Sequence, residues 1–366
     1  MTPPNRTRRR AITGVIAIVA MALVAACSSS SSKATSTTTV AAKPTVTIRL
    51  LAHDSFATSK GVLEDFTKQT GIKVELVQGG DAGSVVNQAI LTKGTPQGDV
   101  LFGIDSTFLT RALNADLFEP HTPAALKGVN ASFLLDPQHR VTPVDYGDVC
   151  LNYDKKWFTT HHVTVPSTLE DLTKPAYKDL LVVENPATSS TGLAFLLSSV
   201  DHFGTTKWQA WWTALRGNGV QVTDGWDQAY NGLFSGGVAS KGTKPLVVSY
   251  ASSPPAEVID SPTPITESPV GVIQAGCYRQ VEGAGVLRGT KHPKEAGELV
   301  DFMLSDRFQA DVAPSMYVYP VRPGITLPEA FAKYSVIPTT VSSLPAAEID
   351  ANRDAWIKQW TDLVVR

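Results

Sequence analysis

The fold is decided by residues 46–105, which read VTIRLLAHDSFATSKGVLEDFTKQTGIKVELVQGGDAGSVVNQAILTKGTPQGDVLFGID. Three apolar, β-rich runs in this stretch predict strands, at 46–52, 73–77 and 99–104. The two segments between them carry apolar residues at helical spacing and predict helices, at 59–69 and 84–91. This alternation is typical of a parallel sheet with helices on its faces.

Polar segments follow each of these strands, at 53–56, 79–84 and 105–106. Because parallel sheets bind ligands beyond the carboxyl ends of their strands, we expect a binding site at this edge. Asp81 to Ser84 precede the second helix, where backbone N–H groups can hold an anion or a hydroxyl. Plain N-capping explains these residues equally well.

A second α/β unit follows residue 146. Its strands are predicted at 180–184 and 246–250, and its helices at 193–203 and 207–215. Ser189 and Ser190 precede the first of these helices and are open to the same two interpretations. Strands near 145–153 and 270–285 would link the two units, which predicts two lobes with a cleft. A last amphipathic helix is predicted over 350–363.

Aromatic residues divide into predicted core and candidate binding surface. Those at helical spacing predict core: Trp208, Trp211, Trp212, Trp356 and Trp360. Tyr319 is also assigned to the core. Trp226 stands among turn residues and Tyr250 ends a strand, so each fits the core or a ligand site equally well.

The N-terminus predicts export. Residues 1–26 combine four arginines with an apolar run that is shorter than the ~20 residues needed to span a bilayer, as in a signal peptide. The end of this run, Leu23-Val24-Ala25-Ala26-Cys27, resembles the lipobox of bacterial lipoproteins, which implies acylation of Cys27 and a membrane anchor. Residues 27–44 would be a flexible tether. An ordinary secretory signal is the alternative, and the arginines leave open general or twin-arginine export.

Charge and composition limit the classes of function. The 366 residues include 32 Lys+Arg and 34 Asp+Glu, and removing residues 1–26 takes the net charge from −2 to −6. This acidity excludes a general nucleic-acid binder, which needs a basic surface. With 43% hydrophobic residues the chain as a whole is not disordered.

Two further features bear on chemistry. Cys150 and Cys277 lie in strand-like runs and predict a disulfide in an oxidising compartment, the alternative being two buried thiols. The metalloprotease, nucleophile-elbow, P-loop and dinucleotide motifs are absent, and His161-His162 is interpreted as surface. No local base accompanies Ser189 or Ser190, so we expect neither an enzyme nor a cofactor.

Seven stretches carry a family resemblance. In order they are HDSF (53–56), DYG with YDK (145–155), NPATSSTGL (185–193), VTDGWDQAY (222–230), VSYASSP (248–254), YVYPV with TLP (317–328), and ANRDAWIKQW (351–360). Together they resemble the periplasmic thiamine-binding proteins of ABC importers, over nearly the whole chain from about residue 45.

The resemblance implies the ligand contacts. By position they fall on Asp81, Ala82, Ser84, Ser189, Ser190, Trp226, Tyr250, Ala251, Ser252, Ser253, Pro254 and Tyr317. Thiamine carries a permanent cation, which the faces of Trp226 and Tyr317 would stabilise. Tyr250 and the Ser252-Ser253 loop would hold its aminopyrimidine, and the helix N-termini would hold its hydroxyethyl arm or a phosphate.

Three positions depart from the family pattern. His53 stands where relatives often have Tyr, Lys60 where some have Trp, and Ala256 where some have Tyr. Losing the aromatic at 256 puts one side of the pyrimidine sandwich in doubt. Lys60 either favours a phosphorylated ligand or is simply solvated.

The resemblance also implies the architecture and the partners. We expect an α/β protein with the two-lobed, type II periplasmic-binding-protein fold, each lobe a mostly parallel sheet flanked by helices, with the ligand between the lobes. Lobe 1 would comprise 45–145 with the returning segment 278–366, and lobe 2 would comprise 146–277.

The expected protein is a monomer outside the cytoplasmic membrane that binds thiamine, thiamine monophosphate or thiamine diphosphate and delivers it to an ABC permease. The alternatives are the same fold binding ferric ion, a polyamine or a phosphorylated metabolite, and a secreted serine hydrolase.

Overall fold

A computed structural model describes residues 46–342 and 344–366. The predicted signal peptide 1–26, Cys27 and the tether 27–44 lie outside the described residues. Residues 43–366 form one compact unit. Within the part of the chain that is described, no helix combines the length and apolarity that a bilayer span requires.

One ten-stranded sheet organises this unit. The central path runs β2-β1-β3-β9-β5-β8-β6-β7, with β4 beside β9 and β10 beside β5. The strands are β1 (Thr47–Ala52), β2 (Lys73–Gln78), β3 (Val100–Asp105), β4 (Phe118–Glu119), β5 (Thr142–Asp154), β6 (Leu181–Glu184), β7 (Gln221–Thr223), β8 (Leu246–Tyr250), β9 (Val270–Leu287) and β10 (Tyr319–Pro320).

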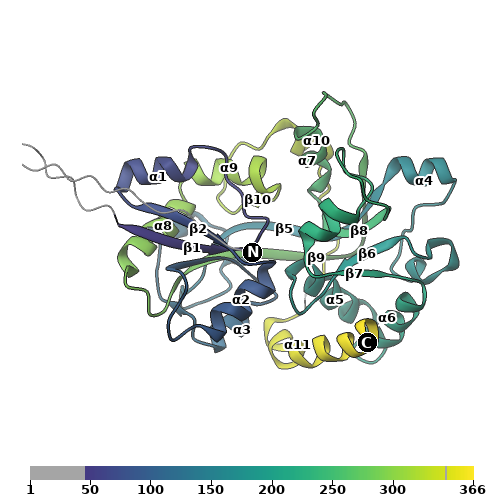
Figure 1. The fold of residues 1–366 in the computed structure, drawn as a ribbon, viewed down its shortest axis with the longest axis horizontal. Coiled ribbons are helices and arrows are strands. Elements are labelled where there is room, and N and C mark those ends of the chain that lie inside the picture. Colours follow the sequence, from purple (N-terminus) through teal and green to yellow (C-terminus); the bar gives the residue numbers. More distant parts are fainter. Residues whose placement is uncertain (1–45, 343) are drawn as a thin grey trace, which may run out of the picture. The chain divides into compact units, whose positions relative to one another are not determined.

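Two parallel groups of strands lie at opposite ends of the sheet. Strands β2, β1 and β3 are parallel, as are β8, β6 and β7. The long antiparallel strands β5 and β9 join the two groups, as Figure 1 shows at the centre of the molecule. The two-lobed α/β fold is therefore confirmed, and so are the linking strands. The boundaries at 145/146 and 277/278 stay a prediction, because β5 and β9 pass through them.

Helices cover both faces of the sheet (Figure 1). The α-helices are α1 (Val62–Thr70), α2 (Ala82–Leu91), α3 (Leu109–Asn114), α4 (Lys155–His161), α5 (Ser190–Phe203), α6 (Trp208–Gly217), α7 (Ser253–Ile259), α8 (Pro293–Met303), α9 (Asp306–Met316), α10 (Glu329–Tyr334) and α11 (Ala346–Trp360). The 3₁₀ turns are η1 (Ala124–Gly128), η2 (Ala131–Phe133), η3 (Glu170–Thr173) and η4 (Pro175–Tyr177), and the π-helical segments are η5 (Gln228–Leu233) and η6 (Thr361–Val365).

The apolar cores differ between the two faces. On one face a single large core continues under both lobes and includes residues of α2, α3, α5, α6 and α11. On the other face, one core packs β1 against α1, α8 and α9, and a separate small core contains Tyr230 and Phe234. The five tryptophans predicted as core are buried in the continuous core. A continuous core on one face and an interrupted core on the other leave room for a site between the two lobes.

Three helices begin earlier than the sequence predicts. Helix α2 begins at Ala82 instead of residue 84, α5 at Ser190 instead of 193, and α11 at Ala346 instead of 350. The first two are capped by Asp81 and Ser189, whose side chains accept hydrogen bonds from the first-turn backbone. The N-capping interpretation of these two residues is therefore confirmed.

The predicted disulfide is present. Cys150 of β5 is bonded to Cys277 of β9, and both residues are buried. Strand β9 bulges around the disulfide. On β5 only Cys150 lies between Val149 and Leu151, whereas their partners on β9, Tyr278 and Ile273, are separated by four residues. The disulfide therefore fixes the two linking strands to each other where their ladder is interrupted.

Candidate functional site

A cavity of about 200 Å³ lies between the separate cores. Six predicted contacts line it: Asp81, Ser190, Trp226, Tyr250, Ser253 and Tyr317. The other six lie outside its lining: Ala82, Ser84, Ser189, Ala251, Ser252 and Pro254. Most of these six residues are buried, and Ser189 and Ser252 have no exposed surface. The structure thus brings together residues from α2, α5, β8, α7 and the end of α9.

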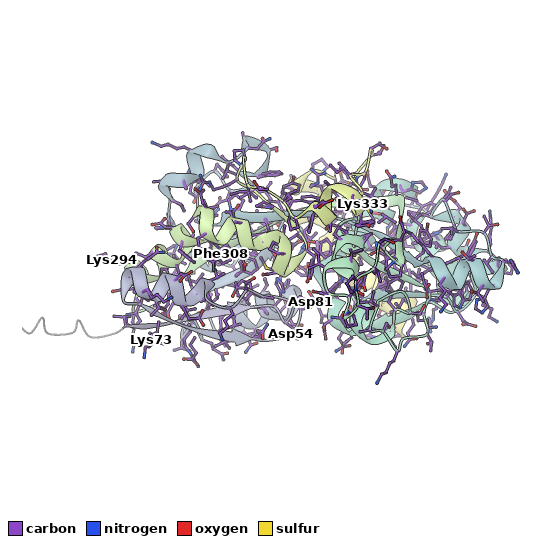
Figure 2. The ribbon with its side chains drawn as sticks, turned by 90° about the horizontal axis from the view of Figure 1, so that it is seen from above. Asp54, Lys73, Asp81, Lys294, Phe308 and Lys333 are labelled. Carbon is purple, nitrogen blue, oxygen red and sulfur yellow. A yellow bond between two sulfur atoms is a disulfide. The ribbon has the colours of Figure 1, made fainter. Side chains whose placement is uncertain are left out.

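Asp81 connects the two sides of the cavity. Its carboxylate accepts hydrogen bonds from the N–H of Ala82 at 2.6 Å, of Trp226 at 2.8 Å and of Ser190 at 3.4 Å. Figure 2 shows Asp81 and Asp54 at the side of their lobe that faces the other lobe, far from Lys73 and Lys294. The carboxylate therefore occupies the N-terminus of α5, where an anion or a hydroxyl was one of the two interpretations of the sequence and where the resemblance implied the hydroxyethyl arm or a phosphate of the ligand.

A second set of contacts brings α2 against the loop before α5. The Ser84 N–H donates to the Thr188 carbonyl at 3.0 Å, and Asn87 Nδ2 donates to the Ala187 carbonyl at 3.2 Å. Gly83 permits this approach, because a Cβ at that position would lie 2.7 Å from the Thr188 carbonyl oxygen. The two lobes are thus in direct contact beside the cavity.

The serines beside the cavity have structural partners. Ser189 Oγ accepts from the Gly192 N–H at 3.4 Å and lies 2.9 Å from Thr191 Oγ1. Ser190 Oγ accepts from Gln280 Nε2 at 3.1 Å. Neither a threonine hydroxyl nor an amide can act as a general base, so these contacts do not activate a nucleophile.

Trp226 forms one aromatic wall. Its ring stacks on Tyr230 with centroids 5.0 Å apart and planes 13° apart, and its Nε1–H donates to Ser249 Oγ at 2.8 Å. The Tyr230 hydroxyl in turn donates to Glu257 at 2.8 Å. Tyr230 was not singled out from the sequence, although its spacing four residues after Trp226 gives a signal. The indole is thus held in a fixed position in the lining of the cavity.

Tyr250 and Tyr317 complete the aromatic lining. Tyr250 Oη donates to Gln280 Oε1 at 2.9 Å. Its ring lies over Gly147, where a Cβ would approach Tyr250 Cδ1 to 2.8 Å. Tyr317 ends α9 in the left-handed conformation, with φ of 58°. Burial and the nearby carboxylates raise the pKa of the partly buried Tyr250 well above the ordinary value, so its hydroxyl is a neutral donor.

Buried acids cluster beneath these rings. Glu282 of β9 lines the cavity. Its partners on the two adjacent strands are Asp105 of β3 and Asp145 of β5. Burial raises the pKa of Asp105 to about 7, with a further contribution from Glu282. Burial and Glu282 also raise the pKa of Asp145, and burial raises that of Glu184. Sequence reasoning missed this cluster, because only the strand register brings its members together.

The charged side chains of the cavity lining are mostly acidic. It includes three carboxylates, Asp81, Asp227 and Glu282, and over the described ranges it contains no lysine or arginine. Lys60 is exposed and outside the lining, whereas His53 and Ala256 are part of it. The described residues contain no cluster of three or more His, Cys, Asp or Glu able to hold a metal ion. Aromatic faces with surplus carboxylates suit a flat organic cation.

Comparison with known proteins gives consistent matches. Residues 96–352 match the family described as bacterial extracellular solute-binding protein. The thiamine-binding periplasmic protein of Escherichia coli K12 is 31% identical over 335 residues, which cover 89% of this chain and 95% of that protein. The thiamine-binding periplasmic protein of Salmonella typhimurium LT2 is 30% identical, with coverages of 89% and 95%. The structure of a periplasmic thiamin binding protein superposes with a TM-score of 0.78 at 28% identity, covering 88% of this chain and 97% of that one.

Proposed function

Because the chain belongs to the bacterial extracellular solute-binding proteins, we propose that it captures thiamine outside the cytoplasm for an ABC importer. The relatives named above are periplasmic, and a solute-binding protein needs no catalytic group of its own. The observation that carries the proposal is the composition of the cavity lining, which joins aromatic rings to carboxylates without a lysine or arginine among the described residues.

Each part of thiamine has a counterpart in this lining. The thiazolium is a permanent cation, and an aromatic face within about 6 Å stabilises such a group by roughly 0.5–2 kcal/mol. Trp226 and Tyr317 are the proposed faces. Tyr250 and Ser253 would contact the flat aminopyrimidine, with Ala256 leaving space where an aromatic would otherwise close the pocket.

The unesterified vitamin fits better than its phosphates. A phosphate favours Lys, Arg or free backbone N–H groups at a helix N-terminus. The Asp81 carboxylate already accepts from the Ser190 and Trp226 N–H groups, and Asp81 and Glu282 would repel an anion. The Ser190 hydroxyl, which accepts from Gln280, can still donate its own proton to the hydroxyethyl arm of thiamine.

Membrane attachment and delivery complete the proposal. Acylation of Cys27 would anchor the protein at the outer face of the cytoplasmic membrane, with residues 27–44 as a tether and the folded unit as a monomer. The liganded form would dock on an ABC permease. Mass spectrometry of the membrane-bound protein should find acyl chains on Cys27, and a Cys27→Ser variant should be released into the medium.

One titration tests the ligand assignment. Residues 43–366, which form one compact unit, are titrated with thiamine, its mono- and diphosphate, spermidine and ferric citrate, using calorimetry and tryptophan fluorescence. We expect thiamine to bind more tightly than about 10 μM, or about −7 kcal/mol, and more tightly than its phosphates. The thiamine assignment is abandoned if no thiamine form reaches that affinity while spermidine or ferric citrate does.

A further inference from the structure

His53 lines the cavity and packs closely against the backbone of β3. It follows β1, and its ring packs on Phe102 with centroids 5.7 Å apart. A Cβ on Gly103 would lie 2.5 Å from His53 Cδ2, and Gly103 has φ of 99° in a bulge of β3. The bulge of β3 therefore makes room for the imidazole beside the ligand.

Carboxylates face this imidazole from the elements around it. His53 Nε2 lies 3.1 Å from Glu282 Oε1 of β9, and their side chains are 13% and 11% exposed. Further negative charge comes from Asp81, which caps α2, and from Asp54, which follows His53 in the loop after β1. Asp145 of β5 and Asp105 of β3 lie behind Glu282, whereas β3 presents the apolar Phe102 to the ring.

The balance of these interactions favours protonation of the imidazole, compared with that of an exposed histidine, when the cavity is empty. Burial by itself lowers the pKa of His53, but Glu282, Asp81 and Asp54 outweigh it and raise the pKa above the ordinary value of 6.5. A protonated His53 supplies the counter-charge for the Glu282 carboxylate. Since His53 is the one basic side chain in the lining as described, no other protein cation can take its place there.

We propose that His53 is an internal counter-cation that a cationic ligand displaces, and that it makes the binding of charged ligands, but not of neutral ones, depend on pH. This inference rests on the proposed binding of an organic cation in the cavity. When the ligand's positive charge enters beside Glu282, the proton on the His53 ring leaves to solvent, so that two like charges do not share the carboxylate. Cation binding therefore strengthens as the pH rises, whereas binding of a neutral ligand of the same shape does not.

The test compares thiamine with its uncharged isostere, in which a thiophene replaces the thiazolium. Both carry the same aminopyrimidine, so its own titration cancels. Affinities are measured by calorimetry at about pH 6 and about pH 8 for the wild type, His53→Gln and Asp105→Asn, each in two buffers of different ionisation enthalpy to count protons released.

We expect wild-type affinity for thiamine to rise at least about fivefold over this range, with proton release, while affinity for the isostere changes less than about twofold. His53→Gln should bind thiamine with less than about a twofold change, and Asp105→Asn should keep the wild-type response. The proposal is overturned if His53→Gln keeps the pH response or if Asp105→Asn alone removes it. If thiamine binds at neither pH, the proposed function is overturned as well. If thiamine binds tightly and its affinity does not respond to pH, this inference alone is overturned.

Discussion

Replacing Gly83 by alanine should block closure of the lobes without touching the ligand. Gly83 lies in the first turn of α2 and outside the cavity lining. The new Cβ would lie 2.7 Å from the carbonyl oxygen and 2.8 Å from the carbonyl carbon of Thr188 in the opposite lobe. Because both atoms belong to backbone, they cannot rotate away, and the lobes must separate to relieve the overlap.

The size of the effect follows from the overlap. Forcing an extra methyl into a packed contact typically costs about 1–3 kcal/mol. If thiamine binds to the form in which α2 touches the loop before α5, this cost reduces affinity by roughly 5- to 150-fold. The reduction should appear mainly as faster dissociation, since the wedge destabilises the closed complex and leaves the open form accessible.

A matched control separates closure from general damage. Gly217 ends α6, and nothing lies within 4 Å of a Cβ added there, so Gly217→Ala should bind thiamine like the wild type. The Gly83 Cβ also lies 2.6 Å from Phe108 Cζ in its own lobe, which is relieved in the double variant Gly83→Ala/Phe108→Leu. The measurements are calorimetry, stopped-flow tryptophan fluorescence and thermal unfolding of the unliganded protein. Unchanged thiamine affinity in a stably folded Gly83→Ala protein would refute the closure argument.

Three further changes have defined outcomes. Trp226→Ala should weaken thiamine binding by at least about 1 kcal/mol in calorimetry while Trp226→Phe loses less, and equal affinities would assign the ring to support of Tyr230 alone. Asp105 has a folded-state pKa of about 7 against an ordinary 3.8, so its stabilising contribution is complete below about pH 4 and lost as the pH rises to about 7. The free energy of unfolding of the wild type, measured with urea, should therefore fall by up to about 4 kcal/mol relative to that of Asp105→Asn over that range. Parallel pH profiles of the two proteins would contradict this. The Cys150→Ala/Cys277→Ala variant, which opens a link across 127 residues, should lose about 2–5 kcal/mol of unfolding free energy, and an unchanged urea midpoint would count against a stabilising disulfide.

Local sequence patterns were sufficient for the longer strands and for much of the aromatic lining, whereas the short strands β4, β7 and β10 were not predicted. The apolar run at 246–250 coincides with β8, and Tyr250 at its end points into the cavity. Trp226 was ambiguous because a tryptophan among turn residues packs in a core or lines a site with equal ease. The structure places it at the edge of a small core, where its ring stacks on Tyr230 and also lines the cavity.

The acidic cluster could not be predicted in the same way. Asp105, Asp145 and Glu282 come from three strands far apart in sequence, and their approach depends on the register of β3 and β5 against β9. A shift of one residue would turn each side chain to the opposite face. The role of Asp81 was equally hidden, since a cap residue is recognisable from sequence whereas its hydrogen bonds to Ser190 and Trp226 exist only when two lobes meet.

The same carboxylates explain how a ligand could drive closure. Asp81 and Glu282 belong to one side of the cavity and Asp227 to the other, so closing an empty cavity gathers three carboxylates around a single basic side chain of the described lining, His53, in a poorly solvated space. That cost is reduced when a cation lies between them, and the interaction is strongest when both sides are near. A permanent cation therefore has a larger interaction free energy with the closed form than with the open form, which is the condition for shifting the equilibrium. A neutral molecule of the same shape would gain the aromatic contacts but would leave the repulsion in place.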